Sequence, residues 1–254
     1  MSEPTIRAVS RALAILRTMN RARRWTLHEL HQETGLPKPT LFRMLQTLQA
    51  DGFVVSDIAR HNYSLTRRVL ELSQGYAEPS ALVAAAAPIT REVTRRIHWP
   101  LALGLLEGGY LVVAHSTMPY SPLAVRTSTL GHKLAWRSSA MATIYLAFQP
   151  ADRQQALLET LTEYWTLPQE RQAFEHDLQA LKTAGYAVRQ ASQRGESATL
   201  AVPILENQYS VAAIGMTTFA GSLTPRLIED MLPVLQETAE RVLDNVSTTL
   251  SPEN

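Results

Sequence analysis

The residues that follow Gly35 include side chains of the kinds that bind nucleic acid. Arginine can donate two hydrogen bonds to guanine, glutamine can pair with adenine in the same two-point way, and threonine or lysine can hold a phosphate or a base edge. Leu41, Met44, Leu45 and Leu48 recur through this segment at helical spacing. If that stripe is buried, the opposite face exposes the following candidate DNA contacts: Lys38, Pro39, Thr40, Phe42, Arg43 and Gln46.

The neighbouring elements indicate how this face would be positioned. Residues 6–19 repeat apolar side chains at helical spacing, and Thr26 can cap a short second helix that Gly35 ends. Residues 53–55 and 63–65 are typical of two short strands around a polar turn. Helix, helix, turn, helix and hairpin is the winged helix-turn-helix order, in which the helix after the turn enters the major groove. This context favours DNA contact over an ordinary solvated helix face.

Further polar residues flank the predicted recognition helix. Arg60 and His61 in the hairpin turn, and Thr26 beside the basic run 21–24, are candidate contacts to phosphates, and which residues read bases stays open. Residues 1–75 carry 11 Lys and Arg against 6 Asp and Glu, while the remainder carries 13 against 17. A basic module followed by an acidic one suggests that only the first faces a polyanion.

The remainder of the chain predicts a second domain of mixed elements. Residues 67–98 look mostly helical, as a linker would. Strands are expected at 101–106, 110–114, 186–190, 199–204 and 211–217, and helices at 138–148, 151–161, 168–184 and 225–246. This order predicts an α+β fold, in which helices cover an antiparallel sheet. The expected boundaries are 1–66 for the DNA-binding domain, 67–98 for the linker and 99–254 for the second domain.

Several functional classes find no support in the sequence. The chain has no cysteine, which excludes disulfides, thiolate metal sites and cysteine nucleophiles. No phosphate-binding glycine loop or nucleophile-elbow motif occurs, so we expect no cofactor, no metal and no catalytic residue. The apolar amino-terminal run, broken by Arg7 and Arg11, fits neither a signal peptide nor a membrane span, and we expect a cytoplasmic protein. Two alternatives remain open, namely an enzyme whose triad assembles only in the fold and a winged helix used for protein contacts.

Longer segments carry a family resemblance. AVSRALAIL, TGLPKPTLFRMLQTLQADGFV and YSLTRRVLELS resemble the DNA-binding half of the IclR family of transcription regulators. LGHKLAWRSSAMATIYLAF, LKTAGYAV and LAVPI are similar to the effector domain of that family, and IHWPLALGLLEGGYLVVAHST resembles a subgroup that activates the catabolism of hydroxyphenylpropionate and related aromatic acids. The resemblance implies a GAF-like ligand-binding domain and homodimers paired through the DNA-binding halves, often assembled into homotetramers. It also implies operator DNA as a partner and, for an activator, contact with RNA polymerase.

The resemblance further implies a pocket for a small aromatic carboxylate, between the sheet and the start of a helix. The positions that match the family pattern are Leu123, Arg126, Trp136, Ser138, Ser139, Ala140, Met141, Arg189, Ser197, Thr199 and Thr217. Helix-start amides and two hydroxyls suit a carboxylate, and either Arg126 or Arg189 could bind it as a fork. Trp136 and Met141 could cover an aromatic ring or could be core residues. A monocarboxylate or a dicarboxylate would fit. The subgroup resemblance favours an activator, and the alternative is a repressor released by the same ligand.

Overall fold

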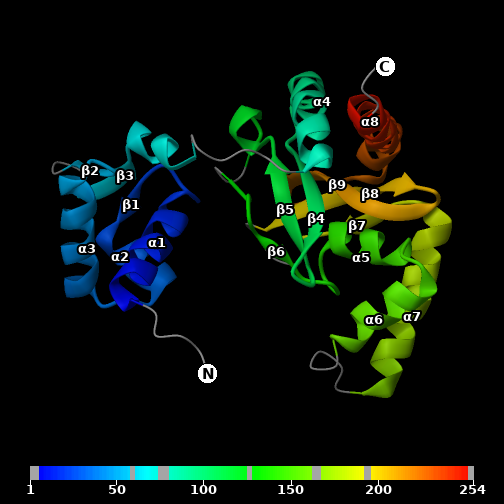
Figure 1. Cartoon of the computed structure of the whole chain (residues 1–254), viewed down its shortest axis with the longest axis horizontal. Coiled ribbons are helices and arrows are strands. Elements are labelled where there is room, and N and C mark those ends of the chain that lie inside the picture. Colours follow the sequence, from blue (N-terminus) through cyan, green and yellow to red (C-terminus); the bar gives the residue numbers. More distant parts are fainter. Residues whose placement is uncertain are drawn as a thin grey trace. The chain divides into compact units, whose positions relative to one another are not determined.

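The computed structural model of the chain describes residues 6–57, 61–73, 80–124, 128–161, 167–191 and 196–250 (Figure 1). The chain divides into two compact units near residue 77. The smaller unit holds three helices and a three-stranded sheet, whereas the larger one is built on a six-stranded sheet. Among the described residues, no helix is both long and apolar enough to span a bilayer.

The smaller unit is a winged helix-turn-helix, as predicted. Its elements are α1 (Arg7–Met19), β1 (Trp25–Thr26), α2 (Leu27–Thr34), α3 (Lys38–Ala50), β2 (Val54–Asp57), β3 (Asn62–Leu65) and the 3-10 helix η1 (Arg67–Ser73). The apolar stripes of the three helices meet in one core that includes Ile15, Leu30, Leu41 and Leu45, all fully buried. The sheet runs in the order β1-β3-β2 and is antiparallel throughout. The two-residue strand β1 was not expected, and it anchors the hairpin to the start of α2.

Local interactions hold α2 at its start and at its end, and they thereby fix the turn that leads to α3. Thr26 and Glu29 form a capping box: the Thr26 backbone N–H donates to the Glu29 carboxylate at 2.7 Å, and the Glu29 N–H donates to the Thr26 hydroxyl at 3.2 Å. Gly35 ends the helix in the left-handed conformation, with φ 66°, which favours glycine. His31 Nδ1 lies 2.8 Å from the Leu36 carbonyl oxygen across the turn. The angle at which α3 leaves α2 is therefore set by local bonds.

We expect Thr26→Ala to lower the free energy of unfolding of this unit by about 1 kcal/mol, because an amide at the start of α2 loses its acceptor. The hydrogen bonds from Thr26 lower the pKa of Glu29 below its ordinary value. The stabilisation from Glu29 is therefore present at neutral pH and is lost as the pH falls through that lowered pKa. Urea unfolding at pH 7 and at pH 3 measures both effects. Thr26→Ser keeps the acceptor and serves as the control; if it costs as much as Thr26→Ala, the cap is not the cause.

The larger unit contains one antiparallel sheet with helices on both faces, which confirms the predicted α+β class. Its elements are α4 (Ala81–Ile97), β4 (Leu101–Glu107), β5 (Tyr110–Ser116), the 3-10 helix η2 (Met118–Tyr120), β6 (Lys133–Leu134), α5 (Ala140–Ala147), α6 (Ala151–Glu159), α7 (Pro168–Ala184), β7 (Ala187–Arg189), β8 (Ser197–Glu206), β9 (Tyr209–Phe219) and α8 (Pro225–Leu250). The strand order is β6-β5-β4-β9-β8-β7, so very short strands form both edges. The expected strands and helices of this unit are all found, whereas β6 and the short 3-10 helix η2 were not expected.

The sheet separates two apolar cores. Alternate residues of β8 point to opposite faces, so Leu200 packs with α4 and α8 while Ala201 packs with α5. α5 lies close to the sheet because β4 and β9 each carry a glycine beneath Met141, namely Gly104 and Gly215. This close approach places the first turn of α5 over the middle of the central strands β4 and β9.

Candidate nucleic-acid interface and effector site

The structure places the predicted recognition face of α3 on the surface. Leu41 and Leu45 are fully buried, and Leu48 is nearly so. Lys38, Pro39, Phe42, Arg43 and Gln46 are exposed on the other side of the helix, and Thr40 is half-buried. Phe42 exposes 46% of its surface, which is large for an apolar side chain on a lone helix face. The face is therefore polar and accessible, with one apolar residue that could touch a base methyl group.

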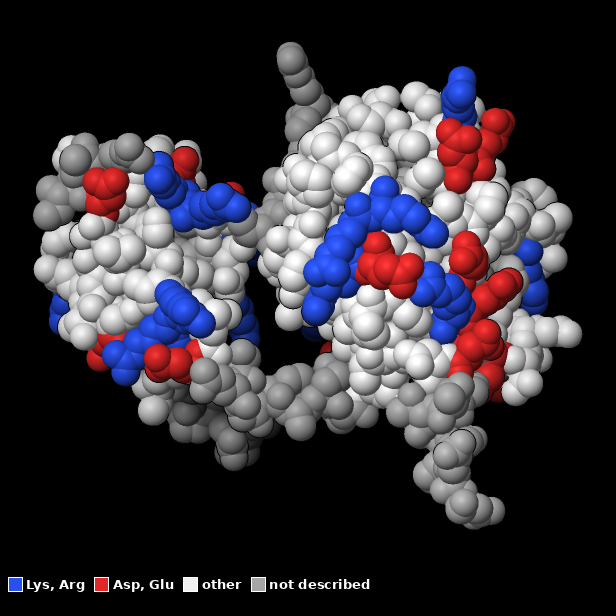
Figure 2. Space-filling view, turned by 90° about the horizontal axis from the view of Figure 1, so that it is seen from above, with Lys and Arg blue, Asp and Glu red and all other residues white. Residues whose placement is uncertain are grey.

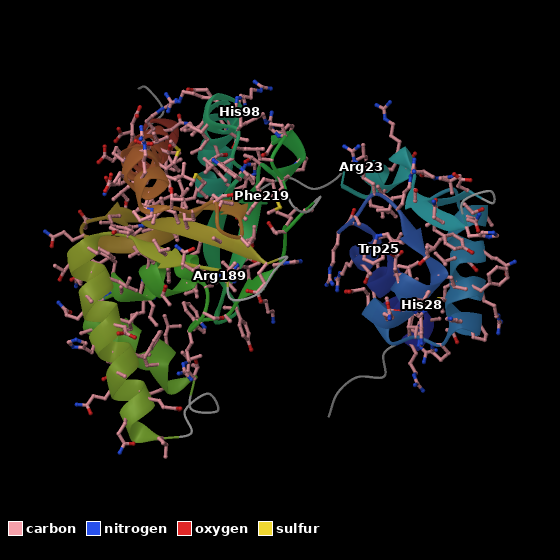
Figure 3. All side chains as sticks on the ribbon, turned by 180° about the vertical axis from the view of Figure 1, so that it is seen from behind. Arg23, Trp25, His28, His98, Arg189 and Phe219 are labelled. Carbon is pink, nitrogen blue, oxygen red and sulfur yellow. The ribbon has the colours of Figure 1, made fainter. Side chains whose placement is uncertain are left out.

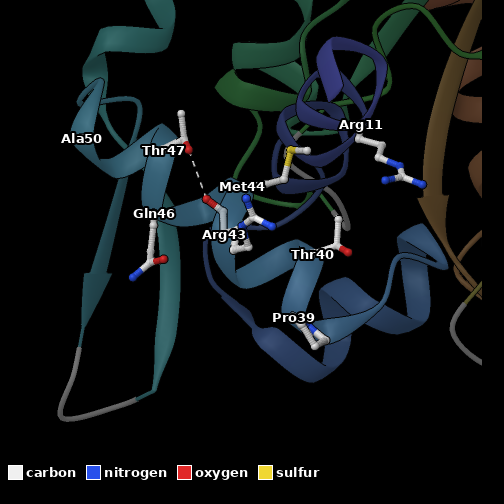
Figure 4. Close-up of a pocket in the computed structure, with 8 residues that line it drawn as sticks. All are labelled: Arg11, Pro39, Thr40, Arg43, Met44, Gln46, Thr47 and Ala50. Atoms are coloured by element: carbon white, nitrogen blue, oxygen red, sulfur yellow. Dashed lines mark hydrogen bonds between the residues drawn. The ribbon is translucent and has the colours of Figure 1, made fainter. Parts of the chain in front are cut away.

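Two hollows flank this face. The one on the α1 side is lined by Arg11, Pro39, Thr40, Arg43, Met44, Gln46, Thr47 and Ala50 (Figure 4). The one on the wing side is lined by Leu27, Phe42, Gln46, Gln49, Ser56, Asp57, His61, Asn62 and Tyr63. The Gln49 side chain donates to the Ser56 hydroxyl at 2.8 Å and so ties α3 to β2. Sequence reasoning missed Arg11 and Thr47, because the position of α1 beside α3 depends on the folded core.

The other predicted DNA contacts lie around the wing. His61 lies in the hairpin turn with φ 49°, and Arg60 falls outside the described residues. Thr26 pairs with Asn62 across β1 and β3, so it lies at the base of the wing, but its hydroxyl is engaged in the cap of α2. Arg23 and Trp25 precede it on the same segment (Figure 3), and the Trp25 indole donates to the Met19 carbonyl at 3.2 Å.

Charged groups on the larger unit are of mixed sign. In the space-filling view, Lys and Arg side chains of this unit lie interleaved with Asp and Glu on the face shown (Figure 2). One ion pair, between Arg241 Nη2 of α8 and Glu92 Oε2 of α4, has a separation of 2.7 Å. Interleaved charges attract a polyanion weakly, so that face of the larger unit offers no broad surface for DNA.

Four of the predicted effector residues meet on one face of the sheet. Arg189, Thr199 and Thr217 are direct neighbours across β7, β8 and β9, and Ser197 lies two residues before Thr199 on the same face. The Arg189 guanidinium donates to the carbonyl of Ser197 and, at 3.2 Å, to its hydroxyl. The row is half-buried and polar, and it faces the side of the sheet on which α5 packs (Figure 3).

The start of α5 supplies a second group of predicted residues. Ser138, Ser139 and Ala140, together with Arg189, line a hollow of about 600 Å³ between α5, α7 and β7. The Ser139 side chain makes no capping bond at the start of α5, although its carbonyl accepts from the Thr143 hydroxyl at 3.1 Å. Arg137 and Asp177 line the same hollow and were not predicted. Helix-start amides, two hydroxyls and two guanidinium groups suit a small anion, while the Asp177 carboxylate in the same hollow opposes one.

The remaining predicted effector residues are placed differently. Trp136 and Met141 are each only 4% exposed and belong to the core beneath α5. The Trp136 ring lies 6.3 Å from that of Tyr145, and burial raises the pKa of the Tyr145 phenol. Leu123 is half-buried and does not line the α5 hollow, and Arg126 lies outside the described residues. In the part of the chain that the structure describes, no three acidic or histidine side chains gather to hold a metal ion.

Comparisons with known proteins match both units. The IclR helix-turn-helix domain model matches residues 8–57, and the model of the bacterial transcriptional regulator IclR C-terminal domain matches residues 74–243. The glycerol operon regulatory protein of Streptomyces coelicolor is 29% identical over 235 residues, which cover 88% of this chain and 91% of that protein.

Solved structures agree at the level of fold. The IclR structure from Thermotoga maritima aligns with a TM-score of 0.62 at 20% identity, over 95% of this chain and 99% of that one. An IclR homolog from Microbacterium hydrocarbonoxydans, complexed with 4-hydroxybenzoate, aligns with a TM-score of 0.58 at 18% identity, over 95% of this chain and 99% of its own. At such identities the structures support the architecture alone.

Proposed function

Because the chain belongs to the IclR family of bacterial transcriptional regulators, we propose that it controls an aromatic-acid catabolic operon in response to a small aromatic carboxylate. The chain is a DNA-binding transcription regulator and not an enzyme. The observation that carries the DNA-binding part of the proposal is the exposed face of α3, which follows a fixed turn and lies beside a wing. In this proposal the protein works in the cytoplasm, where a bacterial regulator meets its DNA.

On the DNA, Arg43 binds guanine as a fork and Gln46 pairs with adenine, while Lys38 and Thr40 hold phosphates at the start of α3. The wing residue His61 contacts phosphates that flank the groove. The other candidate contacts complete the interface at its margins: Thr26, Pro39, Phe42 and Arg60. Support comes from the exposure of α3 and from the bond between Gln49 and Ser56, which holds the wing beside the helix.

The DNA-binding halves pair as a homodimer through α1. Ile6, directly before α1, and Val9 and Leu13 on its outward face expose 71%, 54% and 46% of their surfaces. An apolar stripe of this kind on a surface helix is typical of a helix partner. Two copies would place two α3 helices on successive turns of a near-palindromic operator. A homotetramer, assembled from two such dimers, is the alternative, and sedimentation of the purified protein distinguishes the two assemblies.

The effector binds at the start of α5. Its carboxylate accepts from the Ser138 and Ser139 hydroxyls and the Ala140 amide, with Arg189 or Arg126 as the cation. In this proposal Ser197, Thr199 and Thr217 form a polar floor beside the hollow, on the strand row that includes Arg189. Leu123, Trp136 and Met141 would supply an apolar surround only if the ligand reaches beyond the residues that border the hollow. Support comes from the hollow that joins Ser138, Ser139 and Arg189, and from the 4-hydroxybenzoate bound by a homolog of the same fold. As an activator the protein would also contact RNA polymerase; a repressor released by the same acid is the second candidate.

The test is a titration of the purified protein with 4-hydroxybenzoate and phthalate, in the presence of DNA from upstream of its own gene. We expect one acid to shift the affinity or the footprint of the protein on that DNA. A variant carrying Ser138→Ala and Ser139→Ala should bind the acid about tenfold more weakly, because hydrogen bonds to a charged group are lost, and should bind DNA as the wild type does. Acid binding that is unchanged in this variant would remove the α5 site from the proposal.

A further inference from the structure

The hollow on the α1 side of the recognition helix joins two arginines from different helices. Arg11 comes from α1 and Arg43 from α3, and both border a space of about 710 Å³ (Figure 4). The hydroxyl-bearing residues Thr40 and Thr47 line the same space, and no acidic residue is among those that border it. The Thr47 hydroxyl already donates to the Arg43 carbonyl at 3.1 Å, so it offers no hydrogen to a ligand. A concave site with two guanidinium groups, the Thr40 hydroxyl and no carboxylate is complementary to an anion.

Arg11 lacks an acidic partner in the described part of this unit, which leaves its charge available to an external anion. In the same unit, Arg21 is paired with Glu33 at 3.1 Å and Arg68 with Glu71 at 3.3 Å. By contrast, no described carboxylate lies within ion-pair distance of Arg11 or Arg43. Arg11 is moreover half-buried against the unit, where an unpaired charge is costlier than in open solvent. An external anion in the hollow would offset that cost.

The position of the hollow on α3 identifies the anion. Arg43 lies near the middle of the exposed face of α3, whereas Arg11 lies beyond its edge. A helix in the major groove directs its middle toward base edges and its margins toward the two phosphate backbones. In the first turn of α3 the backbone N–H of Thr40 has no partner within the helix, which adds partial positive charge, whereas Pro39 has no N–H to contribute. The opposite flank differs, because it includes the acidic side chain of Asp57.

We propose that the hollow between α1 and α3 seats a phosphate of the DNA backbone, with Arg11 as its principal cation. This inference rests on the proposed entry of α3 into the major groove. Arg11 then adds affinity for DNA of any sequence, whereas Arg43, on the other side of the hollow, distinguishes sequences. α1 thereby contributes to DNA binding directly, from the side that faces α3, as well as to the dimer from its outward face.

The experiment measures binding of the full chain to a random-sequence duplex and to operator DNA over a range of salt concentrations. Arg11→Gln should weaken binding to both duplexes equally, by about tenfold at low salt, and should reduce the slope of log affinity against log salt by about 1, the value for one phosphate contact. Arg11→Lys should restore most of the affinity and the slope, because a phosphate accepts a point charge. Arg226→Gln, which removes the same charge from an exposed position at the start of α8, is the matched control.

Three outcomes would overturn the inference: a salt slope unchanged in Arg11→Gln, the same change in Arg226→Gln, or a loss confined to operator DNA. Thermal unfolding that matches the wild type ensures that weaker binding reflects a lost contact. The proposed function fails separately, when the wild-type protein shows no preference for operator over random DNA. Since the random duplex reports on the phosphate seat by itself, the two failures are distinguishable.

Discussion

Arg43→Ala should bring the affinity for operator DNA close to the affinity for random DNA. A two-point contact with guanine contributes about 1–3 kcal/mol of discrimination against other bases, so two half-sites lose on the order of 100-fold or more. Arg43 is exposed near the middle of the α3 face, and the core beneath it consists of Leu41 and Leu45, so the fold should be unaffected. Fluorescence anisotropy with operator and scrambled duplexes at one salt concentration measures the loss.

Two control variants interpret this result. Arg43→Lys retains the charge but lacks the fork, so it should recover binding to random DNA without recovering the preference for operator. Lys38→Ala should weaken both duplexes alike, because it removes a phosphate contact. If Arg43→Ala weakens both duplexes to the same extent, Arg43 is a backbone contact and sequence is read by Gln46 or by the wing.

Gly215→Ala should destabilise the larger unit, and a change at Met141 should largely relieve the effect. A Cβ atom at position 215 would lie 2.6 Å from the Met141 Sδ atom and 2.7 Å from its Cγ atom, which is closer than van der Waals contact permits. The resulting shift of α5 or of the Met141 side chain should cost about 1–3 kcal/mol. Met141→Ala alone should cost about 2–5 kcal/mol, because it leaves a cavity above Gly104 and Gly215.

The double variant, Met141→Ala with Gly215→Ala, tests whether this contact is the cause. The new methyl group enters space that the methionine has vacated, so the double variant should lose less stability than the sum of the two single variants. Urea unfolding followed by near-ultraviolet circular dichroism measures all four proteins. If the stability losses of the two single variants simply add in the double variant, the clash at position 215 is relieved by a movement that does not involve Met141. The same series tests whether Met141 is only a packing residue. If it is, the variants that stay folded should bind the effector with an affinity that does not depend on their stability.

The sequence predicts the exposed face of α3 well because the buried leucines recur within one helix, so the opposite side follows from helical geometry alone. The strands β4, β5, β8 and β9 were found for the same reason, since their apolar residues follow local patterns. β1 and β6 have two residues each, too few to show a period. They form because neighbouring strands offer unpaired backbone groups, which is a tertiary effect.

The candidate sites were predictable in part. Ser138, Ser139 and Arg189 were identified through family resemblance, and they do border one hollow. Asp177 borders it from α7, and nothing in the spacing of that helix points toward α5. Arg11 was visible only as one of several polar residues on α1, because its place beside Arg43 depends on packing between segments about 30 residues apart. Periodicity determines which face a residue occupies, whereas the partner of that face requires the fold.

The shortness of the outermost strands bears on how the protein behaves at high concentration. An open sheet presents unpaired N–H and C=O groups along its edges, and long flat edges allow chains to join into aggregates. Here the edges are β6, with two residues, and β7, with three. β7 pairs only with residues 199–201 of β8, and beyond that stretch β8 carries Pro203, which has no N–H to donate. When copies of this regulator lie close together on DNA, their short edge strands offer few unpaired backbone groups. Aggregation through strand pairing is therefore disfavoured.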